Sequence, residues 1–481
     1  MLTYSFENRG DDSLYEYLYE QIKKDISEMR LPAGSRLPSK RSFARQLGVS
    51  NITVENAYEL LLAEGYIYSV PRSGYFVSNL SHADLVYSRP SGKEAMALVK
   101  IESEITDGDK KQASKYGKCG TDFASFSGTS GGEDSFPFSI WARLVRKNMT
   151  ENRELLLKKS PSQGVYELRL EIAGWLKEFR GMVISPEQIV IGAGTEYLYG
   201  LLTQLLGRDK IYAVEEPGYT KIGQIYSAQG MKVEHVPLDG EGVSLEALKE
   251  SGAQVLHISP SHHFPTGIIT SIGRRLKLLE WTAGSEDRYI IEDDYDSEFR
   301  MSGKPIQTMF DADRRGRVIY VNTFSKSLAQ AIRISYMVLP EQLMEKYRSG
   351  LGFYSCTVSN IEQFTLADFI KNGYFEKHIN RMRTRYRNQR NRLLKAIRER
   401  AGSLKNIREE HAGLHFLLYA DTQLSDGELV ERAAEKGIAI SMLSSFYDDK
   451  AQAPEHVVII NYSDIDPEKI EEAVGRLFEC F

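Results

Sequence analysis

Short apolar runs alternate with helical stretches throughout the chain beyond residue 120. Apolar runs of this length, separated by helices, are typical of strands in a mainly parallel sheet within an α/β layer. From about Asn360 a long polar helix leads into a smaller α+β segment that ends at Phe481. The strand candidates are residues 188–191, 211–214, 233–236, 255–258, 289–291, 318–321 and 335–339.

The first eighty residues predict three short helices followed by a hairpin. Each helix is preceded by a serine, whose hydroxyl can accept a hydrogen bond from the first helical turn. A Pro-Arg-Ser-Gly turn joins two β-rich runs, which is the pattern of a hairpin. Helix, helix-turn-helix and hairpin in this order make a winged helix. The predicted elements are a helix over 13–30 with a capping box at Ser13 and Glu16, a helix from Ser39 to about Leu47, a helix from Ser50, and strands over 66–70 and 75–77.

The winged helix is a candidate for reading DNA. The net charge of -5 gives no global attraction to nucleic acid, so contact with DNA requires a local basic patch. Such a patch lies on the helix before the turn, and short polar groups open the helix that would enter the major groove. A solvated basic face on a small helical domain is the alternative interpretation. The candidate DNA-binding residues are Ser39, Lys40, Arg41, Arg45, Ser50, Asn51, Thr53, Asn56, Arg72 and Gly74.

The length of 481 residues allows two or three domains. We predict a DNA-binding domain over 1–78, a linker over 79–119 that is rich in Ser, Gly, Lys, Asp and Glu, and a larger domain over 120–481 with a small subdomain from about 360. The three cysteines fit no metal spacing, so no metal is expected. The first residues resemble no signal peptide, and no run reaches the length of a membrane span. We therefore expect a cytoplasmic protein.

Lys326 follows an apolar run within Thr-Phe-Ser-Lys, about thirty residues after an acidic and aromatic run over 289–296. A lysine amine placed among carboxylates and hydroxyls suits an aldehyde cofactor that forms a Schiff base. Asp293, at the end of a buried strand, would protonate a pyridine nitrogen. Tyr295 is predicted on the same strand face, where it would bond the phenolic oxygen of the ring. A plain cluster of charges at a strand end is the alternative.

Three further segments predict the remaining contacts of pyridoxal 5'-phosphate. Gly194, Thr195 and Glu196 follow a strand and open a helix, where backbone N–H groups and the helix dipole favour a phosphate. Tyr219 ends the next strand and would lie flat against the cofactor ring. Each segment is weak evidence alone, but their order and spacing together predict this cofactor. Further phosphate contacts are expected from Thr323, Ser325 and Arg333.

These motifs carry three resemblances. Residues 13–78 resemble the GntR-type winged helix, and the region from about Phe123 to Phe481 resembles the fold-type-I aminotransferases. The whole chain resembles the MocR (GabR-like) family, in which such a reader is fused to such a domain. The supporting motifs are Leu37-Pro38-Ser39, Leu47-Gly48-Val49-Ser50, Gly192-Ala193-Gly194-Thr195, Glu216-Pro217-Gly218-Tyr219, Phe264-Pro265-Thr266-Gly267, Glu292-Asp293-Asp294-Tyr295, Thr323-Phe324-Ser325-Lys326 and Arg333.

The resemblance implies a regulator that binds pyridoxal 5'-phosphate through Lys326 and senses a small amine or amino-acid-like effector by aldimine exchange. It also implies a head-to-tail homodimer, with each reader against the partner's large domain, on double-stranded DNA with spaced half-sites. Phe264 stands where aminotransferases usually have asparagine, so His262 or His263 is expected to replace that contact. In the GABA-responsive type of the family, arginines occupy the positions of Lys221 and Ser445, so these two are the candidate effector-binding residues.

Two functions remain open at this point. In the first, the aminotransferase-like domain is a sensor that regulates transcription, with half-transamination as a residual activity. In the second, the chain is a working aminotransferase that carries a DNA-binding arm, with Lys326 moving protons and Asp293 stabilising the electron sink. The asparagine and arginine replacements favour the sensor.

Overall fold

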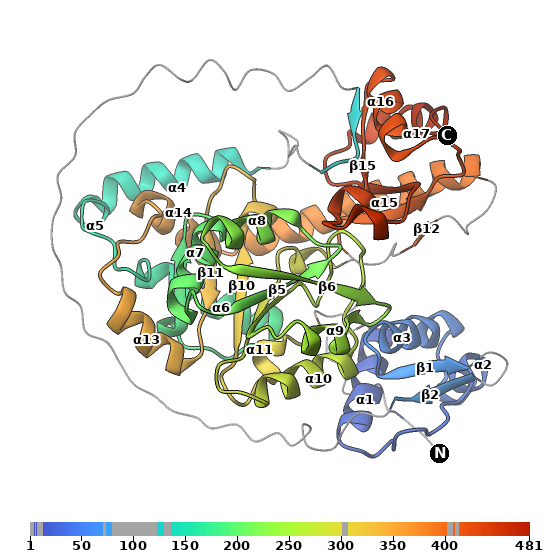
Figure 1. Ribbon diagram of the computed structural model, residues 1–481, viewed down its shortest axis with the longest axis horizontal. Coiled ribbons are helices and arrows are strands. Elements are labelled where there is room, and N and C mark those ends of the chain that lie inside the picture. The colour runs from blue at the N-terminus through green and yellow to red at the C-terminus, as the bar shows by residue number, and fades with distance from the viewer. Residues whose placement is uncertain are drawn as a thin grey trace.

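The computed structural model of the chain describes residues 4, 6, 13–70, 74–78, 123–128, 136–300, 306–401, 407–408 and 413–481. These residues form a small N-terminal winged helix, a large α/β part on an eight-stranded sheet and a C-terminal α+β part (Figure 1). The linker predicted over 79–119 and the candidate residue Arg72 lie outside them. In this described part of the chain, no helix is long and apolar enough to cross a membrane, and no group of His, Cys, Asp or Glu side chains is arranged to hold a metal ion.

The winged helix has the three predicted helices and the predicted hairpin. Ser13 and Glu16 form the expected capping box, and the hydroxyls of Ser39 and Ser50 accept from the backbone N–H groups of their helices. The hairpin is antiparallel, with Ile67 opposite Val77, and both side chains join the core of the domain. The elements are α1 (Leu14–Ser27), α2 (Lys40–Leu47), α3 (Asn51–Ala63), β1 (Ile67–Val70) and β2 (Gly74–Val77).

All seven predicted strands are present in one eight-stranded sheet of order β4-β11-β10-β9-β8-β5-β6-β7. The pairings from β10 through β9, β8 and β5 to β6 are parallel, which confirms a mainly parallel sheet. β11 runs antiparallel to both of its neighbours, and the short β7 adds an antiparallel edge. The strands are β4 (Ile189–Gly192), β5 (Ile211–Glu216), β6 (Lys232–Asp239), β7 (Gly242–Val243), β8 (Val255–Ile258), β9 (Tyr289–Asp293), β10 (Val318–Thr323) and β11 (Ser335–Val338).

Helices cover both faces of this sheet. Consecutive strand residues point to opposite faces, so Ile290 packs beneath Trp281 of α10 while Ile291 packs with Leu202 of α7. Since β4, β5, β8, β9 and β10 run in one direction, their carboxyl ends meet at one edge, which is where parallel α/β sheets bind ligands. The helices are α4 (Phe138–Glu151), α5 (Arg153–Leu156), α6 (Tyr166–Arg180), α7 (Thr195–Leu206), α8 (Thr220–Ala228), α9 (Leu245–Glu250), α10 (Ile272–Ala283), α11 (Met309–Ala312), α12 (Phe324–Ser327) and α13 (Glu341–Leu351).

The long helix expected from about Asn360 is two helices. Gly373, with a φ of +69°, breaks it in a left-handed conformation that favours glycine. The two helices lead into a four-stranded sheet of order β12-β13-β16-β15. The elements are α14 (Asn360–Lys371), α15 (Tyr374–Ala401), β12 (Ile407–Arg408), β13 (His415–Tyr419), α16 (Asp426–Glu435), β14 (Ile438–Ala439), β15 (Ser441–Met442), β16 (Val457–Asn461) and α17 (Ile470–Phe478), with 3₁₀ helices η2 (Pro186–Gln188), η3 (Ser297–Phe299), η5 (Leu443–Phe446), η6 (Lys450–Gln452) and η7 (Pro467–Lys469).

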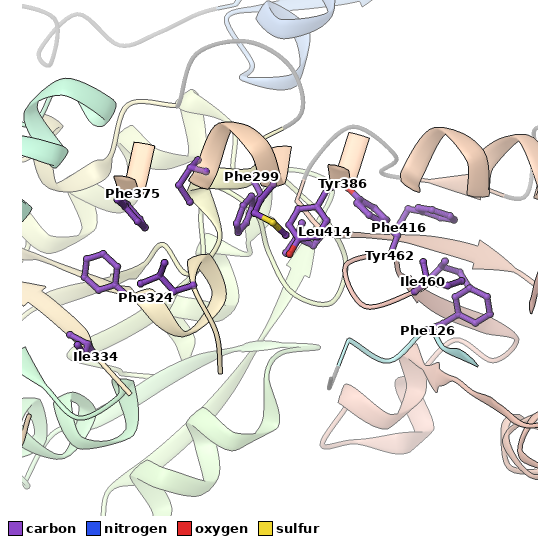
Figure 2. Close-up of a cluster of buried hydrophobic side chains, with 14 of the residues drawn as sticks. Phe126, Phe299, Phe324, Ile334, Phe375, Tyr386, Leu414, Phe416, Ile460 and Tyr462 are labelled. Atoms are coloured by element: carbon purple, nitrogen blue, oxygen red, sulfur yellow. The ribbon is translucent and has the colours of Figure 1, made fainter. Parts of the chain in front are cut away.

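One hydrophobic cluster joins the large sheet to the C-terminal part (Figure 2). Phe324, at the start of α12, packs against Phe375, and Phe299 of η3 packs against Tyr386 of α15. The cluster continues to Phe416 and to the other small-sheet residues labelled in Figure 2. The segment of β3 (Ala124–Ser125) also belongs to this side, because β3 pairs with β14. The edge of the large sheet and the C-terminal part are therefore packed as one body.

Candidate functional site

Asp293 ends β9 as predicted and is almost completely buried. The Tyr199 hydroxyl of α7 donates to its Oδ2 at 2.5 Å. No group in the described part of the chain donates to its Oδ1, although this atom is also buried. A buried carboxylate oxygen without a donor is costly, so the site has a vacant acceptor that suits the N–H of a pyridinium ring.

Two further polar side chains, His257 and Tyr226, lie behind Asp293, and the sequence did not indicate them. His257 of β8 lies with Nε2 3.5 Å from Asp293 Oδ2, and its Nδ1 lies 2.8 Å from the Tyr226 hydroxyl. The facing carboxylate favours the proton on Nε2, so Nδ1 accepts from Tyr226. Burial and the charge of Asp293 raise the pKa of Tyr199, which keeps its hydroxyl a donor. Tyr199, Tyr226 and His257 thus fix the orientation of Asp293.

The other acids of this strand end have separate structural partners. Glu292 accepts from the backbone N–H groups of Met309 and Phe310, and burial raises its pKa to about 7. Asp294 forms a buried ion pair with Arg180. The acidic run is therefore not a solvated charge cluster, because its carboxylates are buried. Asp293 and Asp294 each keep one buried oxygen without a described donor, but the other oxygen of Asp294 is already in an ion pair with Arg180.

The structure places Arg333 beside Gly194, where phosphate contacts are predicted, and the phosphate site itself stays a prediction. Gly194 precedes α7 with a φ of +91°, and a Cβ there would overlap the Arg333 guanidinium. No side chain caps α7, so its first N–H groups remain available to an anion, in contrast to the helices capped by serine. Arg333 also lies 3.6 Å from Glu196, whose other oxygen contacts Lys221 at 2.7 Å. The predicted phosphate site thus has an uncapped helix start and a half-exposed guanidinium.

Lys326 is exposed on the short helix α12, directly after β10. The Thr323 hydroxyl accepts from the Ser325 N–H and from the Ser335 hydroxyl, and the Ser325 hydroxyl donates to the Ile332 carbonyl. These two side chains therefore shape the turn that presents Lys326, and their predicted phosphate contacts stay a prediction. The same turn leaves the lysine amine accessible at the carboxyl edge of the sheet.

The predicted place of Tyr295 on the strand face is wrong. β9 ends at Asp293, so Tyr295 lies in the turn that follows and not on the strand face, and the alternation argument for it was wrong. The turn directs its hydroxyl to within 3.3 Å of His262 Nδ1, which also lies 2.9 Å from Asp296 Oδ2. His262 has a buried Nε2 to which no described group is bonded. His262 and Tyr295 therefore lie within hydrogen-bonding reach of each other, and their contacts with a cofactor stay a prediction.

His415 of β13 is a site residue that the sequence analysis missed. Its Nε2–H donates to the Pro265 carbonyl at 3.0 Å, and its ring lies 4.8 Å from that of His262. Burial lowers the pKa of His415 well below its usual range, and the charges of His262 and Lys326 lower it further. The C-terminal part thus brings a neutral imidazole into the field of Lys326. A contact between residues 150 positions apart leaves no local sequence signal.

The residue that replaces the asparagine lies in an aromatic group. Phe264 contacts Tyr219, Phe446 and His415, with ring centroids 6.3, 5.0 and 5.1 Å away. Tyr219 is half exposed, so its outer face is open to a ring that stacks on it. The Gly218 N–H donates to the Phe446 carbonyl, which ties this loop to the C-terminal part.

The structure does not bring the two predicted effector residues together with the lysine in any described contact. Lys221 is half exposed and pairs with Glu196. Ser445 is exposed, and its hydroxyl donates to the Met442 carbonyl. Their role in binding an effector stays a prediction.

The DNA-reading face is exposed as expected for most of its residues. Arg41, Arg45 and Asn51 are exposed, whereas Lys40 pairs with Glu55 at 2.7 Å and so loses part of its attraction to phosphates. The Ser50 and Thr53 hydroxyls are 2.8 Å apart within the cap of α3. Of the other predicted DNA-binding residues, Ser39 is exposed and Asn56 is half-buried. Gly74 begins β2 with a φ of +112°.

The sequence analysis missed Ile52, an apolar side chain that is 66% exposed at the start of α3. This position suits a thymine methyl group in the major groove. Its signal in the sequence is an apolar residue outside the buried stripe of α3, which is Val54, Ala57, Tyr58, Leu60 and Leu61.

Comparison with known proteins agrees with this geometry. Residues 14–77 match the family described as bacterial regulatory proteins, gntR family, and residues 135–477 match aminotransferase class I and II. The uncharacterized HTH-type transcriptional regulator YdeL of Bacillus subtilis (strain 168) is 37% identical over 98% of this chain and 98% of its own length. The probable rhizopine catabolism regulatory protein MocR of Rhizobium meliloti is 33% identical over 98% of this chain and 94% of its own length.

Among solved structures, the kynurenine aminotransferase of Pyrococcus horikoshii shares 27% sequence identity with a TM-score of 0.64, over 75% of this chain and 91% of its own. That similarity covers the aminotransferase-like region, whereas the two regulators match almost the whole chain. The relatives that share both parts are transcriptional regulators. The chain belongs to the MocR-like subfamily of GntR transcriptional regulators, in which a DNA-binding winged helix is joined to an aminotransferase-like domain.

Proposed function

We propose that this regulator binds pyridoxal 5'-phosphate at Lys326 and uses it to sense a small amine or amino-acid-like effector. The observation that carries the proposal is the buried Asp293 carboxylate, which has one oxygen held by Tyr199 and the other without a donor. A buried carboxylate oxygen without a donor is costly, so this strand end favours a hydrogen-bond donor from outside the chain, and the N–H of a pyridinium ring would supply one.

The surrounding residues fit the rest of the cofactor. The uncapped start of α7 and Arg333 would hold its phosphate, and Tyr219 would stack on its ring. His262 and Tyr295 would share the hydrogen bond to its phenolic oxygen. When bound, the cofactor supplies an aldehyde that joins to an amine and a ring that withdraws electrons.

The proposed sensing event is exchange at Lys326, in which an effector amine takes the place of the lysine amine. The freed Lys326 would then add a charge close to the neutral His415. The effector can shift the protein only to the extent that it binds two arrangements of the domains with different affinity. Lys221 and Ser445 are the proposed effector contacts.

The proposal includes the assembly implied by the family. We propose a DNA-binding domain over 1–78, a linker over 79–119 and an effector domain over 120–481, with two chains in a head-to-tail homodimer on spaced half-sites. The pairing of Lys40 with Glu55 weakens the attraction of one reader to phosphates, which supports the use of two readers.

A working aminotransferase with a DNA-binding arm is the second candidate. The complete set of Lys326, Asp293 and the polar groups behind Asp293 supports it, because these groups are also what proton transfer at the cofactor requires.

One experiment separates the two. The purified protein is loaded with pyridoxal 5'-phosphate and mixed with candidate amines and a keto acid, while the visible absorption of the cofactor and the affinity for DNA are followed. Repeated turnover of the amino group identifies the enzyme. A stable spectral change with altered DNA affinity, and no turnover, identifies the sensor.

A further inference from the structure

Glu64, the C-cap residue of α3, is a carboxylate buried to 3% exposure between the winged helix and the large domain. It accepts from the Tyr19 hydroxyl at 2.7 Å and lies 3.5 Å from Lys23, both on the reader. From the large domain, Arg300 reaches it at 3.2 Å. A carboxylate at the C-terminus of a helix is disfavoured by the helix dipole, so these partners must compensate for that position as well as for burial.

The charge of Glu64 is retained despite its burial. Burial alone would raise the pKa of Glu64, but Lys23 and Arg300 together hold it below its usual value. The contact between the two domains is therefore an ion pair in a buried setting, where removal of one partner leaves an uncompensated charge.

The backbones meet at the same point. The Ile272 N–H, in the first turn of α10, donates to the Glu64 carbonyl at 2.8 Å, and the Ile272 side chain packs against the core of the winged helix. Gly65 has a φ of +77°, and a Cβ there would lie 2.9 Å from Ser271 Cβ. Only glycine fits this approach. Within this chain the reader and the large domain thus touch closely, with the winged helix beside α9 and α10 (Figure 1). In the proposed head-to-tail dimer, the same two surfaces would meet between each reader and the partner's large domain.

Two short segments lead from this contact to the cofactor site. Arg300 follows η3 directly, and η3 follows the turn of Tyr295 and Asp296, both of which contact His262. Phe299 anchors η3 in the hydrophobic cluster that also holds Phe324, the first residue of the Lys326 helix (Figure 2).

On the other side, Arg275 lies one turn after Ile272 in α10. Its guanidinium donates to the Pro260 carbonyl at 2.6 Å, and also to the carbonyls of Thr270 and Gln307. Pro260 is two residues before His262. The Arg300 side and the Ile272 side of the domain contact are thus both tied to the segment around His262.

The contact leaves the reading end free. Glu64 follows the last residue of a 13-residue helix, so Asn51 lies about 20 Å away at the exposed opposite end. Docking therefore fixes the direction in which α3 points and does not cover it. For two readers on spaced half-sites, this direction decides whether both reach their major grooves.

We propose that the Glu64–Arg300 contact, together with the Ile272–Glu64 backbone bond, is a regulatory joint through which the state of the Lys326 site sets the orientation of the DNA reader. This inference rests on the proposed function, because it requires a cofactor that binds at Lys326. The filled site keeps the segment from Asp293 to Arg300 ordered and holds the joint in the closed form that the structure shows. By linkage, a closed joint must in turn strengthen cofactor binding by the same factor.

The test compares Glu64→Gln with Glu59→Gln in the full-length chain, since Glu59 is an exposed residue of the same helix. Hydrogen exchange of the Ile272 amide is measured with and without saturating pyridoxal 5'-phosphate. In the wild type and in Glu59→Gln, the cofactor slows this exchange by about fivefold or more. In Glu64→Gln the exchange is fast in both states.

Arg300→Gln is the second variant. It leaves Tyr19, Lys23 and Glu64 together within the reader, so the winged helix stays folded, which thermal unfolding verifies. Both joint variants weaken cofactor binding by the factor that the cofactor exerts on docking. Both also abolish the effect of the cofactor on affinity for a DNA duplex selected by the wild type from random sequences, whereas Glu59→Gln does not.

The failures are distinguishable. If the wild type binds the cofactor but the exchange of the Ile272 amide does not change, the joint is contradicted while the proposed function stands. If the wild type shows no visible cofactor band after soaking, the proposed function falls and the joint with it.

Discussion

The Tyr199 hydroxyl donates to Asp293 Oδ2 at 2.5 Å and leaves Oδ1 of the same carboxylate buried without a donor from the described residues. One oxygen is thus used by the fold, and the other would accept from the pyridinium N–H of the proposed cofactor. Asp293→Asn is expected to weaken binding of pyridoxal 5'-phosphate by at least tenfold, about 1.4 kcal/mol, because an amide holds a pyridinium N–H less well. Fluorescence titration with the cofactor measures this.

Tyr199→Phe is expected to weaken cofactor binding by about tenfold, since it removes a hydrogen bond to a charged group. Tyr212→Phe is the matched control, because Tyr212 is also a buried tyrosine but its hydroxyl bonds the Gly207 carbonyl. Equal losses in the two variants would show that Tyr199 acts through packing and not through Asp293.

His257 is expected to act on the cofactor through Asp293. His257→Phe removes the Nε2–H that faces the carboxylate and leaves the Tyr226 hydroxyl without its acceptor. Cofactor binding should weaken about fivefold, and the pH at which the visible band of the bound cofactor changes should shift. His257→Asn, which offers an amide N–H, should restore much of both. If His257→Phe lowers stability but leaves the pH dependence of the cofactor band unchanged, His257 contributes only to packing.

Stability without cofactor should fall as pH rises toward 8. Burial raises the pKa of Glu215 from 4.5 to about 8, so between these values the folded chain holds a proton that the unfolded chain has lost. This stabilising contribution is fully present below about 4.5 and is lost as pH rises through about 8. Glu215→Gln, which imitates the protonated form, should reduce the fall between pH 5 and 8 by more than about 1 kcal/mol.

Denaturant unfolding across this pH range measures the effect, with Glu59→Gln as an exposed control. Burial also raises the pKa of Glu298 to about 8, so the slope decreases in Glu215→Gln and does not vanish. A slope equal to that of the wild type would contradict the buried proton on Glu215.

Two variants of the winged helix should affect DNA binding in different ways, one through affinity for all sequences and one through discrimination between sequences. Arg45→Ala should weaken binding to all DNA sequences alike and lower the slope of log affinity against log salt by about 1, because Arg45 is exposed and is a proposed phosphate contact. Asn51→Ala should reduce discrimination between sequences by about 1–3 kcal/mol. Arg153→Ala, in α5 far from the reader in Figure 1, is the control. If both reader variants had the same salt slope and the same loss of sequence discrimination, the assignment of Arg45 to phosphates and of Asn51 to bases would be contradicted.

Local features of the fold were predictable from the sequence. The caps at Ser13, Ser39 and Ser50 depend on hydrogen bonds within three residues, and the seven large strands on contiguous apolar runs. Non-local pairings were not predictable. β3 and β14 are joined across more than three hundred residues, and a two-residue strand has no pattern of its own.

The residues of the candidate site likewise fall into those that the sequence predicts and those that it does not. Lys326 and Asp293 follow strand ends that are visible as apolar runs, so their place at the sheet edge was predictable. Tyr295 was assigned to the strand because alternation gives no sign of where a strand stops. Tyr199 and His257 appear in the sequence as single polar groups within apolar elements, and only the sheet order brings them to Asp293.

The most direct test of the account is the covalent position of the cofactor. The full-length protein is soaked in pyridoxal 5'-phosphate, reduced with borohydride, digested and analysed by peptide mass spectrometry. The account predicts one pyridoxyl group on Lys326, absent from a folded Lys326→Ala variant. Modification of another lysine such as Lys221, or no modification at all, would contradict it.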